Sequence, residues 1–201
     1  MNLQTKSTVA GPAHAYFFGY GSLVNRDTHS FGNAHPARLT GWRRTWRTTT
    51  RREVAFLSVT KDAGSWIDGL IAPVPDADWD ALDLREGAYE RLPAEHMVQH
   101  PLPHRPRIAV YSVPDASEAT AGDHHLLLSY IDVVVQGYMR EFGAGGAQHF
   151  FDTTDGWDAP VLDDRAAPHY PRACRLNGEE RDTVDAGLNR LGVVISRPSQ
   201  F

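Results

Sequence analysis

The sequence is poor in cysteine and lysine, and it has no long apolar run. Its single cysteine, Cys174, excludes an intramolecular disulfide and is typical of a reducing compartment such as the cytoplasm. No apolar stretch approaches the roughly 20 residues that cross a bilayer, and residues 1–14 lack the apolar segment of a secretory signal. Lysine occurs only as Lys6 and Lys61. These absences favour a cytoplasmic protein without membrane segments.

The length of 201 residues is enough for one domain with its own apolar core. A net charge of −5 argues against a nucleic-acid partner. We expect residues 1–14 to be a disordered lead and residues 15–201 to form a single domain. Its C-terminal extension, from about residue 143, follows no pattern that assigns it a role. Nothing in the sequence specifies an oligomeric state.

The first half of the chain is rich in short segments of strand character, and the second half has helical periodicity. Apolar or alternating runs predict strands at 15–20, 37–49, 53–60, 69–74, 89–99 and 107–113. Capping residues and glycine stops predict helices from Asp76 to about Glu86, from Asp123 to Phe142 and over 179–191. Residues 144–172 resemble a loop. The predicted fold class is α+β, with a small mixed or antiparallel β-barrel and flanking helices.

One candidate site is the loop Phe18-Gly19-Tyr20-Gly21-Ser22-Leu23, which follows the first strand. Two glycines allow the backbone to approach a ligand closely or to adopt positive φ. Successive N–H groups can then hold a carboxylate or an oxyanion. An ordinary tight turn is an equally good interpretation of these residues alone.

A second candidate is Glu86, at the end of the predicted helix. Helical geometry places Trp79, Leu82 and Glu86 in one narrow sector. A carboxylate beside apolar residues loses hydration, which raises its pKa toward the range that a general acid/base needs. The alternative is a helix-end glutamate that reaches solvent or pairs with Arg91.

Other constellations offer weaker hypotheses. Three histidines spaced by four resemble zinc ligands on a helix, but Pro101 and Pro103 break any helix there. Five aspartates suggest a solvated acidic loop rather than a calcium site. A run rich in arginine and tryptophan suggests a packed strand rather than a nucleic-acid surface. Cys174 lacks a local activation signal. These sets are His96, His100 and His104; Asp152, Asp155, Asp158, Asp163 and Asp164; and Trp42, Arg43, Arg44, Trp46, Arg47, Arg51 and Arg52.

The loop at 18–23 resembles the signature loop of the γ-glutamylcyclotransferase-like superfamily, in its ChaC-type and AIG2-like branches. Residues 82–91, Leu-Asp-Leu-Arg-Glu-Gly-Ala-Tyr-Glu-Arg, are similar to the segment that carries the family's catalytic glutamate. Residues 39–44 and 129–138 resemble a strand and a helix of the same family. The resemblance extends over roughly residues 16–142, in the same order along the chain.

This resemblance implies an enzyme that cyclises a γ-glutamyl group to 5-oxoproline and releases an amine, amino acid or dipeptide. It implies Glu86 as the acid/base, and a substrate pocket formed by Tyr20, Gly21, Ser22, Leu23, Tyr89 and Tyr130. No metal or cofactor is expected, because the nucleophile is already in the substrate. The expected partner is a small γ-glutamyl compound, with no nucleic acid and no membrane. The alternative is a non-catalytic module that binds a γ-glutamyl or amino-acid ligand.

Overall fold

The computed structural model describes residues 15–49, 52–87, 89–114 and 124–197 of the chain. Its centre is a mixed sheet whose strands follow the order β4-β6-β1-β3-β2-β5, with β8 added beside β2. The bounds are β1 Ala15–Gly19, β2 His35–Thr49, β3 Arg52–Pro73, β4 Glu90–Pro93, β5 Val98–Gln99, β6 Arg107–Ser112 and β8 Thr154–Asp155. β1 runs antiparallel to β3 and parallel to β6.

The sheet curls into a half-barrel because β3 is long and serves two neighbours. Its second half pairs with β1, in a register that sets Gly19 against Leu70. Its first half lies beside the end of β6, where the Ser112 hydroxyl donates to the Val59 carbonyl at 2.8 Å and the Val113 N–H donates to the Ser58 hydroxyl at 2.9 Å. The predicted α+β class and mixed curled sheet are therefore confirmed.

The expected strand lengths were wrong. Residues 53–60 and 69–74 are parts of the one 22-residue strand β3, and β2 has 15 residues. Pairing with β2 continues to Lys61 and resumes at Trp66, across a shift in register between Thr40 and Trp42. Long paired strands with an irregular register bend without ending. Residues 1–14, the expected disordered lead, lie outside the described residues.

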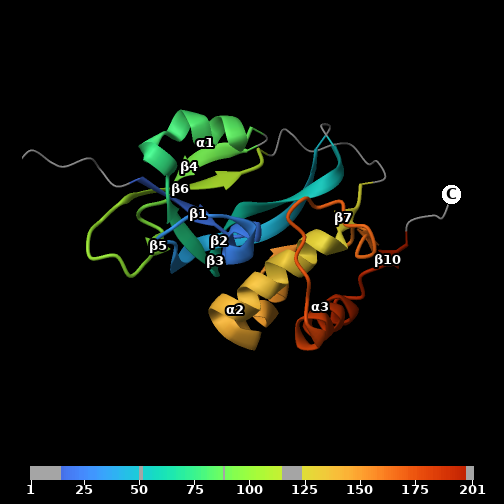
Figure 1. Ribbon diagram of the computed structural model, residues 1–201. Helices are drawn as coiled ribbons and strands as arrows, with labels where there is room; N and C mark the ends of the chain where they lie inside the picture. The colour runs from blue at the N-terminus through green and yellow to red at the C-terminus, as the bar shows by residue number, and fades with distance from the viewer. Residues whose placement is uncertain (1–14, 50–51, 88, 115–123, 198–201) are drawn as a thin grey trace, which may run out of the picture.

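β1 is apolar on both sides because it separates two cores. Ala15 and Phe17 face a smaller cluster that includes Leu82 of helix α1, and Phe18 and Tyr20 face the main core beneath helix α2. Figure 1 places α1 on one side of the sheet and α2 and α3 on the other. A strand buried on both faces has no polar alternation, which explains the continuous apolar run.

Helix α1, Trp79–Arg85, starts later than predicted. Asp78 is its N-cap, and its carboxylate accepts the Ala81 N–H at 3.0 Å. Asp76, the predicted cap, has φ of +51° and belongs to a separate turn that starts at Pro75. A left-handed residue interrupts the helical path, so Asp76 cannot begin this helix. The helix ends on Glu86, as expected.

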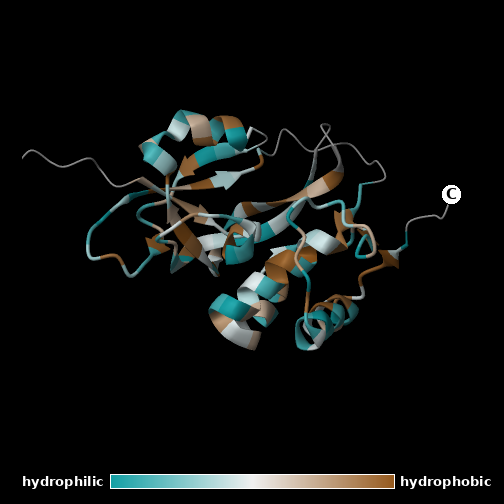
Figure 2. Cartoon of the chain, in the orientation of Figure 1, coloured by the Kyte–Doolittle hydropathy of each residue, from teal (hydrophilic) through white to brown (hydrophobic). Residues whose placement is uncertain are grey.

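Helix α2, Leu128–Asp152, differs from its prediction at both ends. Residues 126–127 form a strand, β7, and Asp123, the predicted cap, is outside the described residues. Gly143 bends the helix with φ of +70° but does not stop it, so residues 144–152 are helical and not loop. Figure 2 shows the apolar residues concentrated in the first half of α2, which covers the sheet.

A smaller three-stranded sheet and helix α3 complete the second half. β7 Leu126–Leu127, β9 Val161–Leu162 and β10 Ile195–Ser196 are parallel neighbours in the order β10-β9-β7. Helix α3, Gly178–Arg190, packs on α2 and begins at a capping box formed by Asn177 and Glu180, close to its predicted bounds. Across the described residues, no helix is both long and apolar enough to cross a bilayer.

Candidate active site

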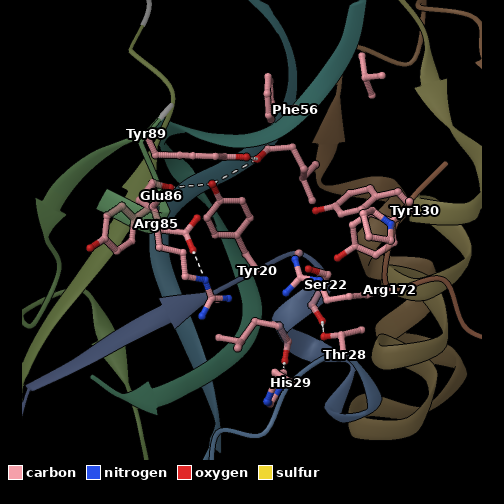
Figure 3. A pocket seen from close by; sticks show the side chains of 18 of the residues that line it. Tyr20, Ser22, Thr28, His29, Phe56, Arg85, Glu86, Tyr89, Tyr130 and Arg172 are labelled. Carbon is pink, nitrogen blue, oxygen red and sulfur yellow. Dashed lines mark hydrogen bonds and ion pairs between the residues drawn. The ribbon is translucent and has the colours of Figure 1, made fainter. Parts of the chain in front are cut away.

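A cavity of about 740 Å³ opens where β1, the first half of β3 and the end of α1 meet α2. The seven predicted site residues all line it, together with part of the segment between β9 and α3. Figure 3 shows this arrangement, with Glu86 and Tyr89 on one side, Tyr130 on the other and Tyr20 between them. The seven are Tyr20, Gly21, Ser22, Leu23, Glu86, Tyr89 and Tyr130.

The loop after β1 needs glycine for close packing. A Cβ on Gly19 would lie 2.1 Å from Cδ2 of Leu23, and a Cβ on Gly21 would lie 2.5 Å from the Tyr130 hydroxyl. Gly21 has φ of −114°, so positive φ is not what this position requires. The loop then turns into a short 3-10 helix, η1, Ser22–Val24. Its glycines therefore bring the backbone against Leu23 and Tyr130.

The carbonyl groups of the loop are bound within the protein. The Gly21 carbonyl accepts the Val24 N–H at 3.0 Å, and the Ser22 carbonyl accepts the Thr28 hydroxyl at 2.8 Å. His29 Nε2 donates to the Leu23 carbonyl at 2.9 Å. Consecutive carbonyls that are already bonded hold the turn in one conformation.

A buried arginine fixes the loop at Tyr20. The Arg44 side chain is fully buried, and its Nε donates to the Tyr20 carbonyl at 3.3 Å. The Tyr138 hydroxyl, which Arg44 also contacts, lies 3.0 Å from the same carbonyl. Burial raises the pKa of Tyr138 to about 12, so its hydroxyl stays protonated. The expected strand face is confirmed, because Trp42, Arg44 and Trp46 all point into the core.

Glu86 is the C-cap of α1, and its backbone is held at both ends. Its N–H donates to the Leu82 carbonyl at 2.9 Å, and its carbonyl accepts the Tyr89 N–H at 2.7 Å. The Glu86 side chain is 30% exposed, and Arg85 Nε lies 3.5 Å from its Oε1. Burial raises the pKa of Glu86 above its ordinary value, and the charges of Arg85 and Arg172 offset part of that rise.

The alternative partner of Glu86, Arg91, bonds elsewhere. Arg91 lies 3.4 Å from a carboxylate oxygen of Asp83, whose other oxygen accepts the Tyr111 hydroxyl at 2.6 Å. Arg91 therefore pairs with Asp83, and Glu86 lines the cavity.

Three tyrosines give the cavity a neutral hydroxyl lining. The Tyr20 hydroxyl donates to the Tyr111 carbonyl at 2.7 Å, and the Tyr89 hydroxyl donates to the Leu57 carbonyl at 3.1 Å. Burial raises the pKa of Tyr20 and of Tyr130 well above the ordinary value, and neighbouring tyrosines add to this effect. These hydroxyls therefore bond without carrying charge.

The segment between β9 and α3 supplies lining residues that the sequence did not reveal. This segment, residues 163–177, is called here the C-terminal segment; it contributes His169, Tyr170 and Arg172 to the cavity. Asp164 fixes its start, because its carboxylate accepts the Ser129 N–H at the beginning of α2 and the His169 N–H, each at 2.8 Å. Asp164 belongs to the predicted acidic loop, where it is buried and bonded rather than solvated.

The competing constellations do not converge on this cavity. In the described parts of the chain, no group of three or more His, Cys, Asp or Glu side chains is arranged to hold a metal ion. Asp152 and Asp155 pair with Arg190 and Arg43. Burial raises the pKa of the Cys174 thiol, which disfavours the reactive thiolate.

Comparison of this chain with known structures identifies its fold. Neither a scan of protein-family models nor a search of curated proteins gave a match. A structure titled gamma-glutamyl cyclotransferase matches 85% of this chain and 98% of its own, with a TM-score of 0.53 and 13% identity. An uncharacterised protein from Homo sapiens matches 85% of this chain and 97% of its own, with a TM-score of 0.51 and 13% identity. The chain therefore has the fold of the γ-glutamyl cyclotransferase-like superfamily.

Proposed function

We propose that this chain is a γ-glutamylcyclotransferase, which converts a γ-glutamyl amide to 5-oxoproline and an amine, amino acid or dipeptide. The observation that carries the proposal is one cavity that combines a partly buried carboxylate of raised pKa, Glu86, with a tightly packed glycine loop at Gly21. The segments that hold Glu86 and Gly21 are also the ones whose sequences resemble the γ-glutamylcyclotransferase-like superfamily. In this proposal the chain acts as a single catalytic domain in the cytoplasm, and the reaction uses no cofactor.

The reaction is an intramolecular aminolysis. Glu86 takes a proton from the substrate α-ammonium group, and the free amine attacks the γ-carbonyl carbon to close a five-membered ring. The carbonyl oxygen carries the negative charge of the tetrahedral intermediate. Collapse breaks the original amide bond as Glu86 returns the proton to the leaving nitrogen. The ring nitrogen then loses its second proton, which ends on the released amine, and the neutral lactam of 5-oxoproline remains. A carboxyl with a raised pKa suits both transfers, because it takes up a proton more readily than an ordinary carboxylate and can still release it.

The loop and the tyrosines serve binding in this proposal. Backbone N–H groups around Gly21, Ser22 and Leu23 hold the substrate carboxylate or the developing oxyanion. Tyr20, Tyr89 and Tyr130 line the site of the glutamyl group, and burial raises the pKa of Tyr20 and Tyr130, so these two hydroxyls stay protonated beside Glu86. Because the nucleophile belongs to the substrate, orientation rather than an external activator accounts for the rate.

The test is Glu86→Gln, assayed by release of 5-oxoproline from a panel of γ-glutamyl compounds. The amide keeps the side-chain shape but accepts no proton, so turnover should fall by about 10²–10⁴-fold. Glu90→Gln, an exposed change four residues further on, is the matched control and should retain full activity. Near-wild-type turnover by Glu86→Gln would remove Glu86 from this role. Tight binding without any 5-oxoproline from the wild type would instead support a binding module.

A further inference from the structure

The cavity extends beyond Glu86 into a polar annex that the proposed reaction does not use. The annex has a volume of about 540 Å³ and is lined by Thr28, His29, Ser30, Phe31, Arg85, Glu86 and Arg172. It shares Thr28, His29, Arg85, Glu86 and Arg172 with the main cavity, so one continuous space passes the candidate acid/base. In Figure 3, Arg85 and Arg172 reach this region from the end of α1 and from the C-terminal segment.

We propose that Arg85 and Arg172 form an anion subsite beside Glu86 that binds the carboxylate of the leaving group. The substrates would then be γ-glutamyl amino acids or peptides rather than γ-glutamyl amines. This inference rests on the proposed function and adds a substrate class to it.

The first argument is charge. Among the described lining residues of the two cavities, two arginines face one carboxylate, so the annex keeps a positive charge even when Glu86 is ionised. The chain as a whole carries −5, so this local excess runs against its overall composition. A positive cleft in an acidic protein attracts an anionic group of the ligand.

The second argument is that the Arg172 guanidinium is available to bind a ligand. Arg85 Nε lies 3.5 Å from Glu86, but the Arg172 guanidinium forms no ion pair with a carboxylate of the described residues. It lies 5.5 Å from the centre of the Tyr170 ring, a contact that leaves its N–H groups free to donate. A guanidinium fork matches a carboxylate in geometry as well as in charge.

The third argument is position. After the glutamyl group occupies the loop and Glu86 approaches its α-amine, the leaving nitrogen must also lie within reach of Glu86, which returns the proton. The leaving group must therefore continue past Glu86. Among the residues that line both spaces, Arg85 and Arg172 are the two cations, and on that path they meet the leaving group rather than the glutamyl end. The neighbouring His29 adds no charge at neutral pH, because burial and then the nearby arginines lower its pKa.

The experiment compares γ-glutamyl-alanine with γ-glutamyl-alaninamide, which differ only in the charge of the leaving group. The wild type should prefer the acid, and Arg172→Gln should lower kcat/KM for the acid by about tenfold while leaving the amide unchanged. Arg172→Lys should retain part of the preference. Arg175→Gln, an exposed arginine of the same segment that lines neither space, is the control and should change nothing.

Two results would overturn the subsite. Equal loss for both substrates would assign Arg172 to the glutamyl end, and no loss for either would exclude it from binding. Calorimetric titration of Glu86→Gln, with and without Arg172→Gln, separates this inference from the proposed function. Tighter binding of the acid that depends on Arg172 would uphold the subsite even if no 5-oxoproline were formed. Equal affinity for acid and amide would refute it.

Discussion

The contact between Gly21 and the Tyr130 hydroxyl gives a quantitative prediction at the centre of the candidate site. Gly21→Ala would place a Cβ 2.5 Å from that oxygen, well inside van der Waals contact. Tyr130 cannot easily retreat, because its ring packs edge-on against Trp46 and Tyr170, with centroids 5.9 and 5.0 Å away. Overpacking of this kind costs about 1–3 kcal/mol of unfolding free energy. Gly21→Ala should therefore destabilise the protein by this amount.

Removing the hydroxyl should suppress the effect. In Tyr130→Phe, the nearest atoms to the new methyl group are Leu57 Cδ2 at 3.5 Å and the ring carbon Cζ at 3.7 Å, both ordinary contacts. Tyr130→Phe alone loses a hydroxyl that faces the Ser22 N–H, at a cost of about 1 kcal/mol. The double variant should thus resemble Tyr130→Phe, with a coupling energy of about 1–3 kcal/mol between the two sites, equal to the cost of Gly21→Ala alone.

Urea unfolding of the four proteins measures this cycle, and Gly32→Ala, where a Cβ meets nothing within 4 Å, is the control. Calorimetry with a γ-glutamyl compound adds the functional comparison. Gly21→Val should weaken binding more than Ser22→Ala, because a branched side chain obstructs the approach to the loop N–H groups. Additive stabilities in the cycle would refute the packing argument, and an unchanged dissociation constant in folded Gly21→Val would remove the loop from the site.

The remaining predictions concern charge, metal and the buried arginine. Because burial raises the pKa of Glu86, the folded state binds a proton more tightly than the unfolded one, and stability falls as pH rises from the unfolded to the folded pKa. Glu86→Gln should gain unfolding temperature relative to the wild type as pH rises through that window; a constant difference would contradict the raised pKa. Turnover should survive both EDTA and Cys174→Ser, and loss restored by zinc would contradict the mechanism. Arg44→Met should cost about 1–3 kcal/mol in urea unfolding, because it leaves the Tyr20 and Asp68 carbonyls to share the single proton of the Tyr138 hydroxyl; a change below about 0.5 kcal/mol would refute that role.

Local signals in the sequence were sufficient for the parts of the fold with simple periodicity. The apolar run of β1 and the glutamates at the start of α3 each have a single physical interpretation. Helix α2 was cut short at Gly143, because a glycine stop and a glycine kink have the same local sequence. The N-cap of α1 was misplaced for a similar reason. Asp76 and Asp78 are equally good capping residues, and only the positive φ of Asp76 distinguishes them.

The candidate site was predictable where function depends on local geometry. Glycines next to a buried strand and a carboxylate beside an apolar helix face are visible in sequence, and the structure brings Gly21 and Glu86 to one cavity. Arg172 and Tyr170 were not predictable, because no periodicity marks the C-terminal segment. Their location depends on bonds between Asp164 and the start of α2, 35 residues away in sequence. Contacts over such separations leave no local pattern.

This contrast suggests where substrate choice resides in the molecule. The proposed chemical steps require Glu86 and the loop at Gly21, whose positions depend on α1, β1 and the buried Arg44. The proposed leaving-group contact comes from Arg172, on a segment held at Asp164 and Arg165 and exposed at Arg172 itself. Substitutions at an exposed position rarely disturb a core. The C-terminal segment can therefore change its charge, and with it the preferred leaving group, while the reaction centre stays intact.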